Sequence, residues 1–132
     1  MMQFLLVAAG GALGAMARYG LGLTVGRLAP GEAWPWTTLT ANITGGLLMG
    51  LLAGWLALKA GAGQESIRLF AAVGVLGGFT TFSAFSLEAA LMIERRELAT
   101  AFVYAVGSVV LSIAALFVGL MIARKLFTGV GA

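Results

Sequence analysis

Long apolar stretches alternate with short polar connections along the whole chain, and this pattern predicts four membrane-spanning helices. A transmembrane helix needs about 20 mostly apolar residues. Stretches of this length cover residues 3–28, a region that begins at Thr37 or Thr38 and ends near Leu58, residues 69–93 and residues 98–123. The connections contain glycine, proline or clustered charge, which end such helices. We therefore expect an all-α integral membrane protein in which residues 1–132 form a single four-helix transmembrane domain.

The composition supports the membrane interpretation. Hydrophobic residues make up 61% of the chain and charged residues 10%, and the mean hydropathy is +1.03. Ordinary globular proteins contain roughly 45–50% apolar and about 25% charged residues. Because a chain this poor in polar groups cannot cover a water-exposed surface, we exclude a soluble enzyme, a nucleic-acid-binding domain and a disordered tail.

Several kinds of chemistry are excluded by missing residue types. The chain contains no Cys, His or Asp, so disulfides, Cys/His zinc sites and Ser-His-Asp catalysis are impossible. We expect that the protein is not an enzyme, because its residues provide no nucleophile–base pair. The net charge is +3 with the cations scattered along the chain, so we also expect no nucleic-acid partner.

The positive charges divide almost equally between the two sides of the predicted membrane. With a cytoplasmic N-terminus, the inside would carry four cations and the outside three. The four are Lys59, Arg68, Arg124 and Lys125, and the three are Arg27, Arg95 and Arg96. Because Lys and Arg asymmetry sets orientation, this near balance fits a weakly biased chain oriented by its first helix, and equally fits dual topology with an inverted dimer.

Small residues recur at helical spacing in the first two spans. They are Gly10 and Gly14 in the first span, and Gly46, Gly50 and Gly54 in the second. Such ridges let membrane helices approach closely. We expect these glycines to serve tight helix packing rather than ligand binding.

One cation lies deep within the first span. Arg18 is separated from Leu28 by roughly 15 Å of helix, which is too far for its side chain to reach water easily. An intramembrane charge of this kind faces a wet cavity or helix carbonyls. Two roles stay open for Arg18, a structural cation that caps the carbonyls of a broken helix and a group that attracts anions.

Polar side chains also lie within the second and fourth spans. Asn42 follows Thr38 by one helical turn, and its amide can join helices or donate to an anion. In the fourth span, Tyr104, Ser108 and Ser112 stand at i, i+4 and i+8 and share one stripe of the helix. A single hydroxyl would be explained by a bond to its own helix backbone. Three hydroxyls on the same stripe of the helix favour a polar track.

The third span combines helix-weakening residues with aromatic rings. Gly77 and Gly78 precede two β-branched threonines, Thr80 and Thr81, and this combination weakens helix continuity. A break inside the membrane frees backbone groups that protein, water or an ion must satisfy, and broken helices form midplane ion sites. The following segment FSAF places Phe82 and Phe85 on one face, and an aromatic ring is positive at its edge. We expect a break near the middle of this span, with ring edges suited to an anion.

Three separated motifs of the chain resemble the Fluc (CrcB-type) fluoride-channel family. The first span contains GGALGAMARY, similar to GG-x-x-GA-x-x-RY in the family. The second contains TLTANITGGLLMG, similar to TL-x-x-N-x-x-G, and the third contains GGFTTFSAF, similar to GG-x-TTFSTF. The order of the motifs matches, and the resemblance covers essentially the whole chain.

The resemblance implies a passive channel in the bacterial inner (plasma) membrane that is selective for fluoride over chloride and protects the cell from fluoride. It implies an antiparallel, dual-topology homodimer with two pores. Its partners would be the fluoride ion, a second copy of the chain and membrane lipid. A structural sodium ion would lie at the dimer interface, and no organic cofactor is implied.

The resemblance also implies roles for individual residues. The fluoride pore would contain the ring edges of Phe82 and Phe85, the Asn42 amide, the hydroxyl track and the supporting Thr38. The backbone carbonyls of Gly77 and Thr80 would bind the sodium ion, and Arg18 would lie near an aqueous vestibule. In place of Ala84 the family often has Thr, so this chain lacks one hydroxyl of that motif. We expect selectivity to survive this departure and conduction to be slower if that hydroxyl contributes to the track.

Two other classes of membrane protein compete with the channel. A small dual-topology, proton-coupled multidrug exporter needs an intramembrane carboxylate, and Glu88 is the sole candidate in the sequence. A structural scaffold would explain the glycines but not the polar cluster of the third span. The exporter depends on Glu88, whereas the channel depends on the two phenylalanines.

Overall fold

The computed structural model describes residues 1–59 and 61–129, and this part of the chain contains four helices long and apolar enough to cross a membrane. Three of them are the continuous helices α1 (Met2–Leu28), α2 (Trp36–Leu58) and α6 (Leu98–Thr128). The third crossing, Gln64–Glu94, is divided. It consists of α3 (Gln64–Ile67), a π-helical segment η1 (Arg68–Leu76), α4 (Gly77–Phe79) and α5 (Phe82–Glu94). The sequence prediction of an all-α membrane protein is confirmed.

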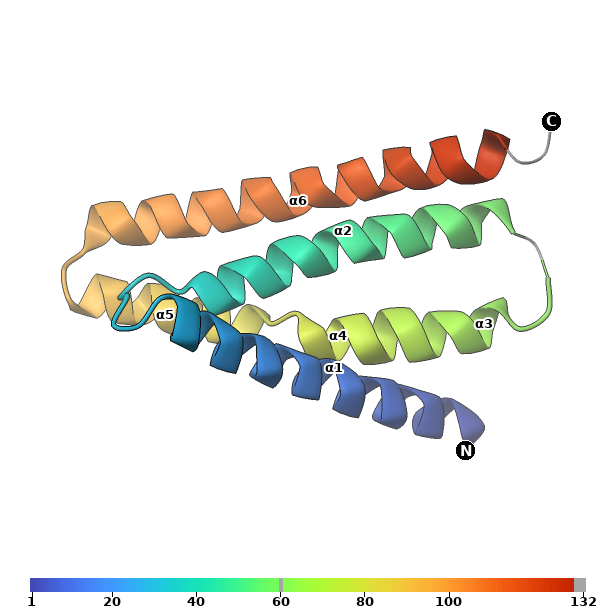
Figure 1. Cartoon of the computed structure of the whole chain (residues 1–132), viewed down its shortest axis with the longest axis horizontal. Coiled ribbons are helices and arrows are strands. Elements are labelled where there is room, and N and C mark those ends of the chain that lie inside the picture. Colours follow the sequence, from blue (N-terminus) through green and yellow to red (C-terminus); the bar gives the residue numbers. More distant parts are fainter. Residues whose placement is uncertain (60, 130–132) are drawn as a thin grey trace.

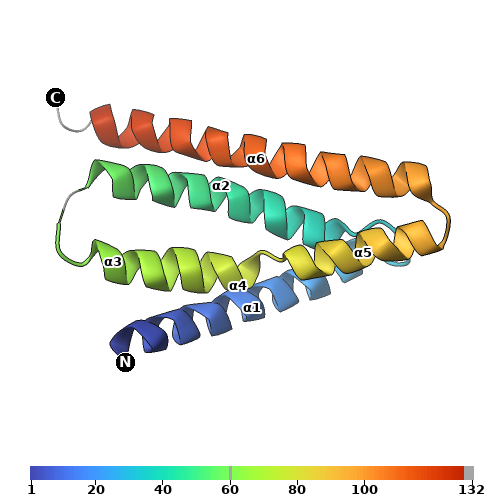
Figure 2. The ribbon, with the colours of Figure 1, turned by 180° about the vertical axis from the view of Figure 1, so that it is seen from behind.

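The four crossings form an up-and-down bundle (Figure 1). The α1–α2 and α5–α6 connections lie at one end of the molecule. The α2–α3 connection lies at the other end, where α1 begins and α6 ends, and the view from behind shows the same arrangement (Figure 2). In both views α6 runs alongside α2, while α1 crosses the interrupted third helix obliquely.

Three predicted helix ends differ from the structure. The second helix was expected to begin with Thr37 or Thr38 as its N-cap, but α2 begins at Trp36 and its N-cap is Pro35. The fourth helix was expected to end at Ala123, yet α6 continues through Arg124 and Lys125 to Thr128. Charge ends the apolar stretch, but Arg and Lys are good helix formers, so the helix extends beyond it. For the same reason the third crossing begins at Gln64 rather than residue 69, and its first turn carries an exposed ion pair between Glu65 and Arg68 at 2.8 Å.

Helices α2 and α6 pack at backbone contact distance through glycine. A Cβ atom on Gly50 would overlap the carbonyl oxygen of Leu116, and one on Gly46 would lie 2.7 Å from the Ser112 carbonyl oxygen. From the opposite side, Gly119 of α6 faces the backbone of α2 in the same way. The prediction that the glycine ridge of the second span serves tight packing is confirmed.

Helix α1 packs on the third crossing by the same means. Gly10 faces the backbone of η1 at Gly74, and the two glycines leave each other no room for a Cβ atom. One turn further along, Gly14 lies against the Phe79 backbone nitrogen. The small-residue face of α1 therefore fixes the position of the segment that ends at the break.

Candidate functional site

The third crossing is interrupted at two threonines. Thr80 and Thr81 are extended, with φ/ψ of −82°/157° and −152°/121°. The Thr81 hydroxyl accepts a hydrogen bond of 3.1 Å from the Ala84 backbone N–H, so Thr81 is the N-cap of α5. This cap satisfies one of the backbone donors that a helix start leaves free. The predicted break is confirmed.

The two glycines before the break remain helical. Gly77 and Gly78 belong to α4, although the sequence suggested that they help to weaken the helix. A Cβ atom on Gly78 would lie 2.5 Å from the Gly11 carbonyl oxygen. Gly78 is therefore required by the close approach of α1, and the change of backbone direction falls on the threonines that follow.

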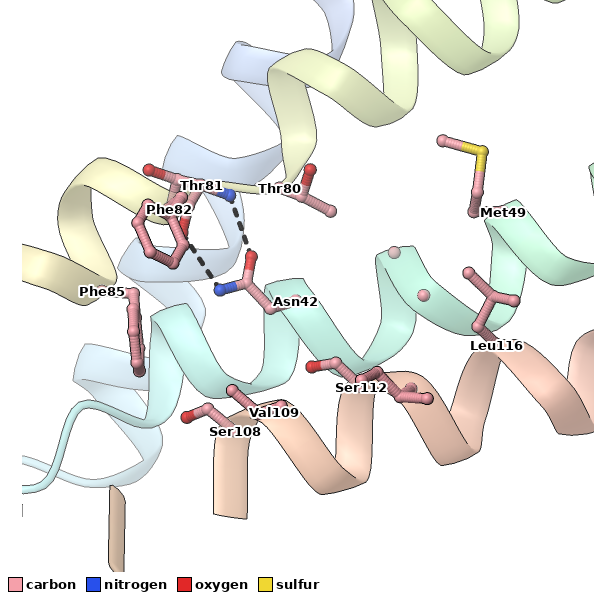
Figure 3. Close-up of a pocket in the computed structure, with 13 residues that line it drawn as sticks. Asn42, Met49, Thr80, Thr81, Phe82, Phe85, Ser108, Val109, Ser112 and Leu116 are labelled. Atoms are coloured by element: carbon pink, nitrogen blue, oxygen red, sulfur yellow. Dashed lines mark hydrogen bonds between the residues drawn. The ribbon is translucent and has the colours of Figure 1, made fainter. Parts of the chain in front are cut away.

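The Asn42 side chain spans the break from α2. Its Nδ2 donates to the Thr81 carbonyl oxygen at 3.1 Å, and its Oδ1 accepts from the Thr81 N–H at 2.9 Å (Figure 3). An unpaired backbone group inside a membrane costs several kcal/mol. One amide thus pairs both backbone groups of the residue that immediately precedes Phe82.

These contacts leave two carbonyls without their ordinary helical donors. In a continuous helix the Gly77 carbonyl would accept from the Thr81 N–H, which here binds Asn42. Similarly, the Thr80 carbonyl would accept from the Ala84 N–H, which here binds the Thr81 hydroxyl. Unwound carbonyls of this kind coordinate Na⁺ in membrane proteins, so the donor chemistry of Gly77 and Thr80 fits a sodium ion.

A cavity of about 460 Å³ lies between the break, α2 and α6. Polar and aromatic groups from all three regions meet on its walls, and Figure 3 shows ten of its residues with labels. The lining residues include five of the predicted pore residues: Asn42, Phe82, Phe85, Ser108 and Ser112. Neither Lys nor Arg is among the described residues that line it. The tertiary structure therefore brings together positions from three separate spans around an uncharged cavity.

The two phenylalanines differ in exposure. Their ring centroids are 5.5 Å apart with an interplanar angle of 40°. Phe82 is 77% exposed, whereas Phe85 is half-buried and its ring lies 5.2 Å from that of Tyr104. Phe85 is consequently held by its neighbours, while Phe82 extends from the wall of the cavity.

The predicted hydroxyl track lies on the inner face of α6. Ser108 is buried, Ser112 is half-buried, and both line the cavity. The Ser108 hydroxyl has no hydrogen-bond partner within residues 1–59 and 61–129. A buried polar group without a partner is costly, so this hydroxyl is available to a ligand in the cavity.

Tyr104 and Thr38 do not line the cavity but meet at Glu88. The Tyr104 hydroxyl donates to Glu88 Oε2 at 2.6 Å, and the Thr38 hydroxyl donates to Glu88 Oε1 at 2.7 Å. We call these three residues the Glu88 cluster. The sequence interpretation considered Glu88 only for the competing exporter. Its position on α5, six residues after Phe82, was the signal that the sequence offered. Its partners Thr38 and Tyr104 lie on other helices, so they could not be deduced from that position.

Arg18 lies apart from these groups. It is half-buried on α1, one turn after Gly14, and is not among the residues that line the cavity. The structure therefore assembles most of the predicted pore residues at one place and leaves Arg18 outside it.

Comparison with known proteins identifies the family. A family model described as "CrcB-like protein, Camphor Resistance (CrcB)" matches residues 5–120. The chain belongs to the CrcB-like family. A relative from Caulobacter sp. (strain K31) is 62% identical over 97% of this chain and 99% of its own length. Relatives from Phenylobacterium zucineum (62%) and Hyphomonas neptunium (58%) each align over 96% of this chain and 99% of their own length.

All three of these CrcB-like relatives are named "Fluoride-specific ion channel FluC". The family resemblance deduced from the three sequence motifs is therefore confirmed. Together with the four apolar helices, the family places the chain among multi-pass membrane proteins. The comparisons support the channel interpretation. They give no support to the proton-coupled exporter.

Proposed function

We propose that this protein is a fluoride-selective ion channel that lets fluoride leave the cell passively and so protects it from fluoride toxicity. The observation that carries this proposal is the cavity in which an amide, two serine hydroxyls and two phenylalanine rings meet, with no Lys or Arg lining it among residues 1–59 and 61–129. The names of the close CrcB-like relatives support the same substrate.

Fluoride is small and strongly hydrated, so a pore must replace its water with several weak donors. Each amide nitrogen carries two N–H donors, and Thr81 takes only one from Asn42. The remaining N–H and the Ser108 and Ser112 hydroxyls can donate to fluoride, while the positive ring edges line its path. Conduction also requires sites that bind fluoride weakly enough for it to leave. A neutral set of donors meets this requirement better than fixed cations would.

An antiparallel homodimer would complete the pore. Phe82 is 77% exposed beside the cavity, near the middle of the third crossing. A second, inverted copy would cover this side and close the path. The nearly equal division of Lys and Arg between the two sides permits both orientations. Two copies would then form two equivalent pores.

A sodium ion would stabilise the dimer at the break. The carbonyls of Gly77 and Thr80 have lost their helical donors to Asn42 and to the Thr81 hydroxyl. When bound, sodium would supply a fixed positive charge that holds these carbonyls and, across the dimer axis, those of the second copy. We propose no organic cofactor and no catalytic residue, and we place the protein in the bacterial inner membrane with lipid and a second copy as its partners. Arg18 would lie near the aqueous vestibule.

The direct test is ion efflux from liposomes that contain the purified protein and are loaded with fluoride or with chloride. We expect rapid fluoride release and negligible chloride release, each followed with an ion-selective electrode. Phe82→Ile and Phe85→Ile should slow fluoride release, because the polar ring edge is lost while an apolar side chain remains.

Phe117→Ile is the matched control, since Phe117 is 60% exposed on α6 and does not line the cavity. It should leave fluoride release unchanged. Equal release from both pore variants and the unmodified protein would contradict the pore assignment. Absence of fluoride release from folded, unmodified protein would contradict the proposed function itself.

A further inference from the structure

A second, smaller cavity lies on the far side of the Glu88 cluster. Its volume is about 120 Å³, and it is lined by Ala33, Pro35, Glu88, Leu91, Met92 and Arg95. Two of these residues belong to the α1–α2 connection, and Arg95 follows directly on α5. Both connections lie at the same end of the molecule, outside the long helices (Figure 1). The small cavity is therefore at the boundary between the bundle and water.

Side-chain contacts run without interruption from the large cavity to the small one. Phe85 lines the large cavity, and its ring lies 5.2 Å from that of Tyr104. Tyr104 donates to Glu88 at 2.6 Å, and Glu88 lines the small cavity. The Glu88 cluster thus forms a partition between the two cavities.

One cation and one carboxylate, Arg95 and Glu88, line the small cavity. Arg95 is the sole cation among the described residues that line either cavity. The Arg95 side chain is about half exposed, and its Nε lies 3.3 Å from Glu97 Oε1. The charge of Arg95 is therefore partly compensated by Glu97 and remains accessible to water. A carboxylate such as Glu88 repels anions, and an arginine lining the same cavity opposes that repulsion.

An unused donor belongs to the residue between two of the lining residues in the sequence. Trp34 stands between the lining residues Ala33 and Pro35, and its ring meets Tyr104 edge-on at 5.6 Å. Its indole N–H is buried without a hydrogen-bond partner in the part of the chain that the structure describes. The indole nitrogen only donates, so an anion or its hydration water would satisfy it.

We propose that the small cavity is the outer mouth of the ion path, where Arg95 gathers fluoride next to the Glu88 partition. This inference rests on the proposed function and extends it, because it places one end of the pore at the α1–α2 and α5–α6 connections.

The absence of cysteine from the chain allows a direct blocking experiment. Ala33→Cys places one thiol in the mouth, and reaction with N-ethylmaleimide before reconstitution fills the cavity. Compared with the same variant before labelling, fluoride efflux from liposomes should fall close to that of protein-free liposomes after labelling. Ala99→Cys is the matched control, because Ala99 is exposed on the first turn of α6 at the same end but outside the cavity. Mass spectrometry verifies complete labelling, and gel filtration verifies folding.

Arg95→Gln tests the role of charge separately. At low ionic strength, loss of this cation should slow fluoride efflux about threefold, and the difference should vanish at about 1 M inert salt. Arg27→Gln removes the same charge from the same end, at the last turn of α1, and should change nothing at either salt concentration.

The outcomes separate the two proposals. The mouth is supported if the label slows efflux at position 33 but not at position 99, and if Arg95→Gln but not Arg27→Gln has a salt-dependent effect. Full flux through completely labelled Ala33→Cys protein, or equal slowing by both labels or by both arginine variants, overturns it while the channel stands. Lack of fluoride release from the unmodified protein overturns the proposed function and the mouth with it.

Discussion

Helices α2 and α6 run unbroken for 23 and 31 residues, whereas the third crossing changes direction at Thr80 and Thr81, although both regions border the same cavity. The unbroken pair is held by shape, because Gly50 and Gly119 bring two complete helices into backbone contact. The interrupted crossing is held by a few directional polar contacts, above all those of Asn42. A complete helix pairs its backbone groups internally, whereas the interrupted crossing leaves the Gly77 and Thr80 carbonyls without their helical donors, so these carbonyls are available to an ion.

The largest expected effect comes from removing the polar contact at the break. Asn42→Ala leaves the Thr81 N–H and carbonyl unpaired, and each unpaired backbone group costs several kcal/mol inside a membrane. We expect lower thermal stability in detergent and near-complete loss of fluoride efflux, because Phe82 follows Thr81 directly. Thr44→Ala changes an exposed position of the same helix and should resemble the unmodified protein. Retained stability in Asn42→Ala would show that the break does not depend on this amide.

A steric change tests whether glycine contacts limit the packing of α2 against α6. Gly50→Ala directs a methyl group at the Leu116 carbonyl oxygen, and overpacking of this kind costs about 1–3 kcal/mol. Gly26→Ala adds an atom that has none of its non-local neighbours among the described residues within 4 Å, and it should instead stabilise α1 by about 0.5–1 kcal/mol. Unfolding measured in detergent should therefore shift in opposite directions for the two variants. A shift in the same direction would mean that the glycine contact does not limit the packing.

A smaller effect is expected from the cap of α5. Thr81→Val keeps the branched shape that an extended residue tolerates but removes the hydroxyl that accepts from Ala84. Loss of an N-cap costs roughly 0.5–2 kcal/mol. Thr80→Val should cost less, because the Thr80 hydroxyl only adds to a Leu76 carbonyl that already accepts the Thr80 N–H. Comparison of the two melting temperatures checks this order, and the reverse order would contradict the capping role.

The smallest expected effect concerns the hydroxyl that the family often has and this chain lacks. Ala84 is half-buried just beyond the break, and Ala84→Thr restores the hydroxyl. We expect a stability change within about 0.5 kcal/mol and faster fluoride efflux in liposomes without chloride leakage. An unchanged rate would show that this hydroxyl lies outside the conduction path.

Several features of the site could be predicted from local sequence. Apolar length gave the four crossings, and the Gly-Gly-Phe-Thr-Thr segment indicated the break, because both depend on near neighbours in the chain. The i, i+4 spacing placed Ser108 and Ser112 on one face for the same reason. The sequence did not reveal that Gly78 stays helical, since that depends on the distance to α1.

By itself the sequence determined that this protein is a four-helix membrane protein with polar groups inside its apolar spans. Hydrophobic length and helical period are properties of contiguous residues. Only the tertiary structure decided that Asn42 pairs with Thr81 and that Glu88 receives the Thr38 and Tyr104 hydroxyls. Thirty-nine and fifty residues separate Asn42 from Thr81 and Thr38 from Glu88. The choice among distant polar partners is made by how the glycine-rich faces bring the helices together.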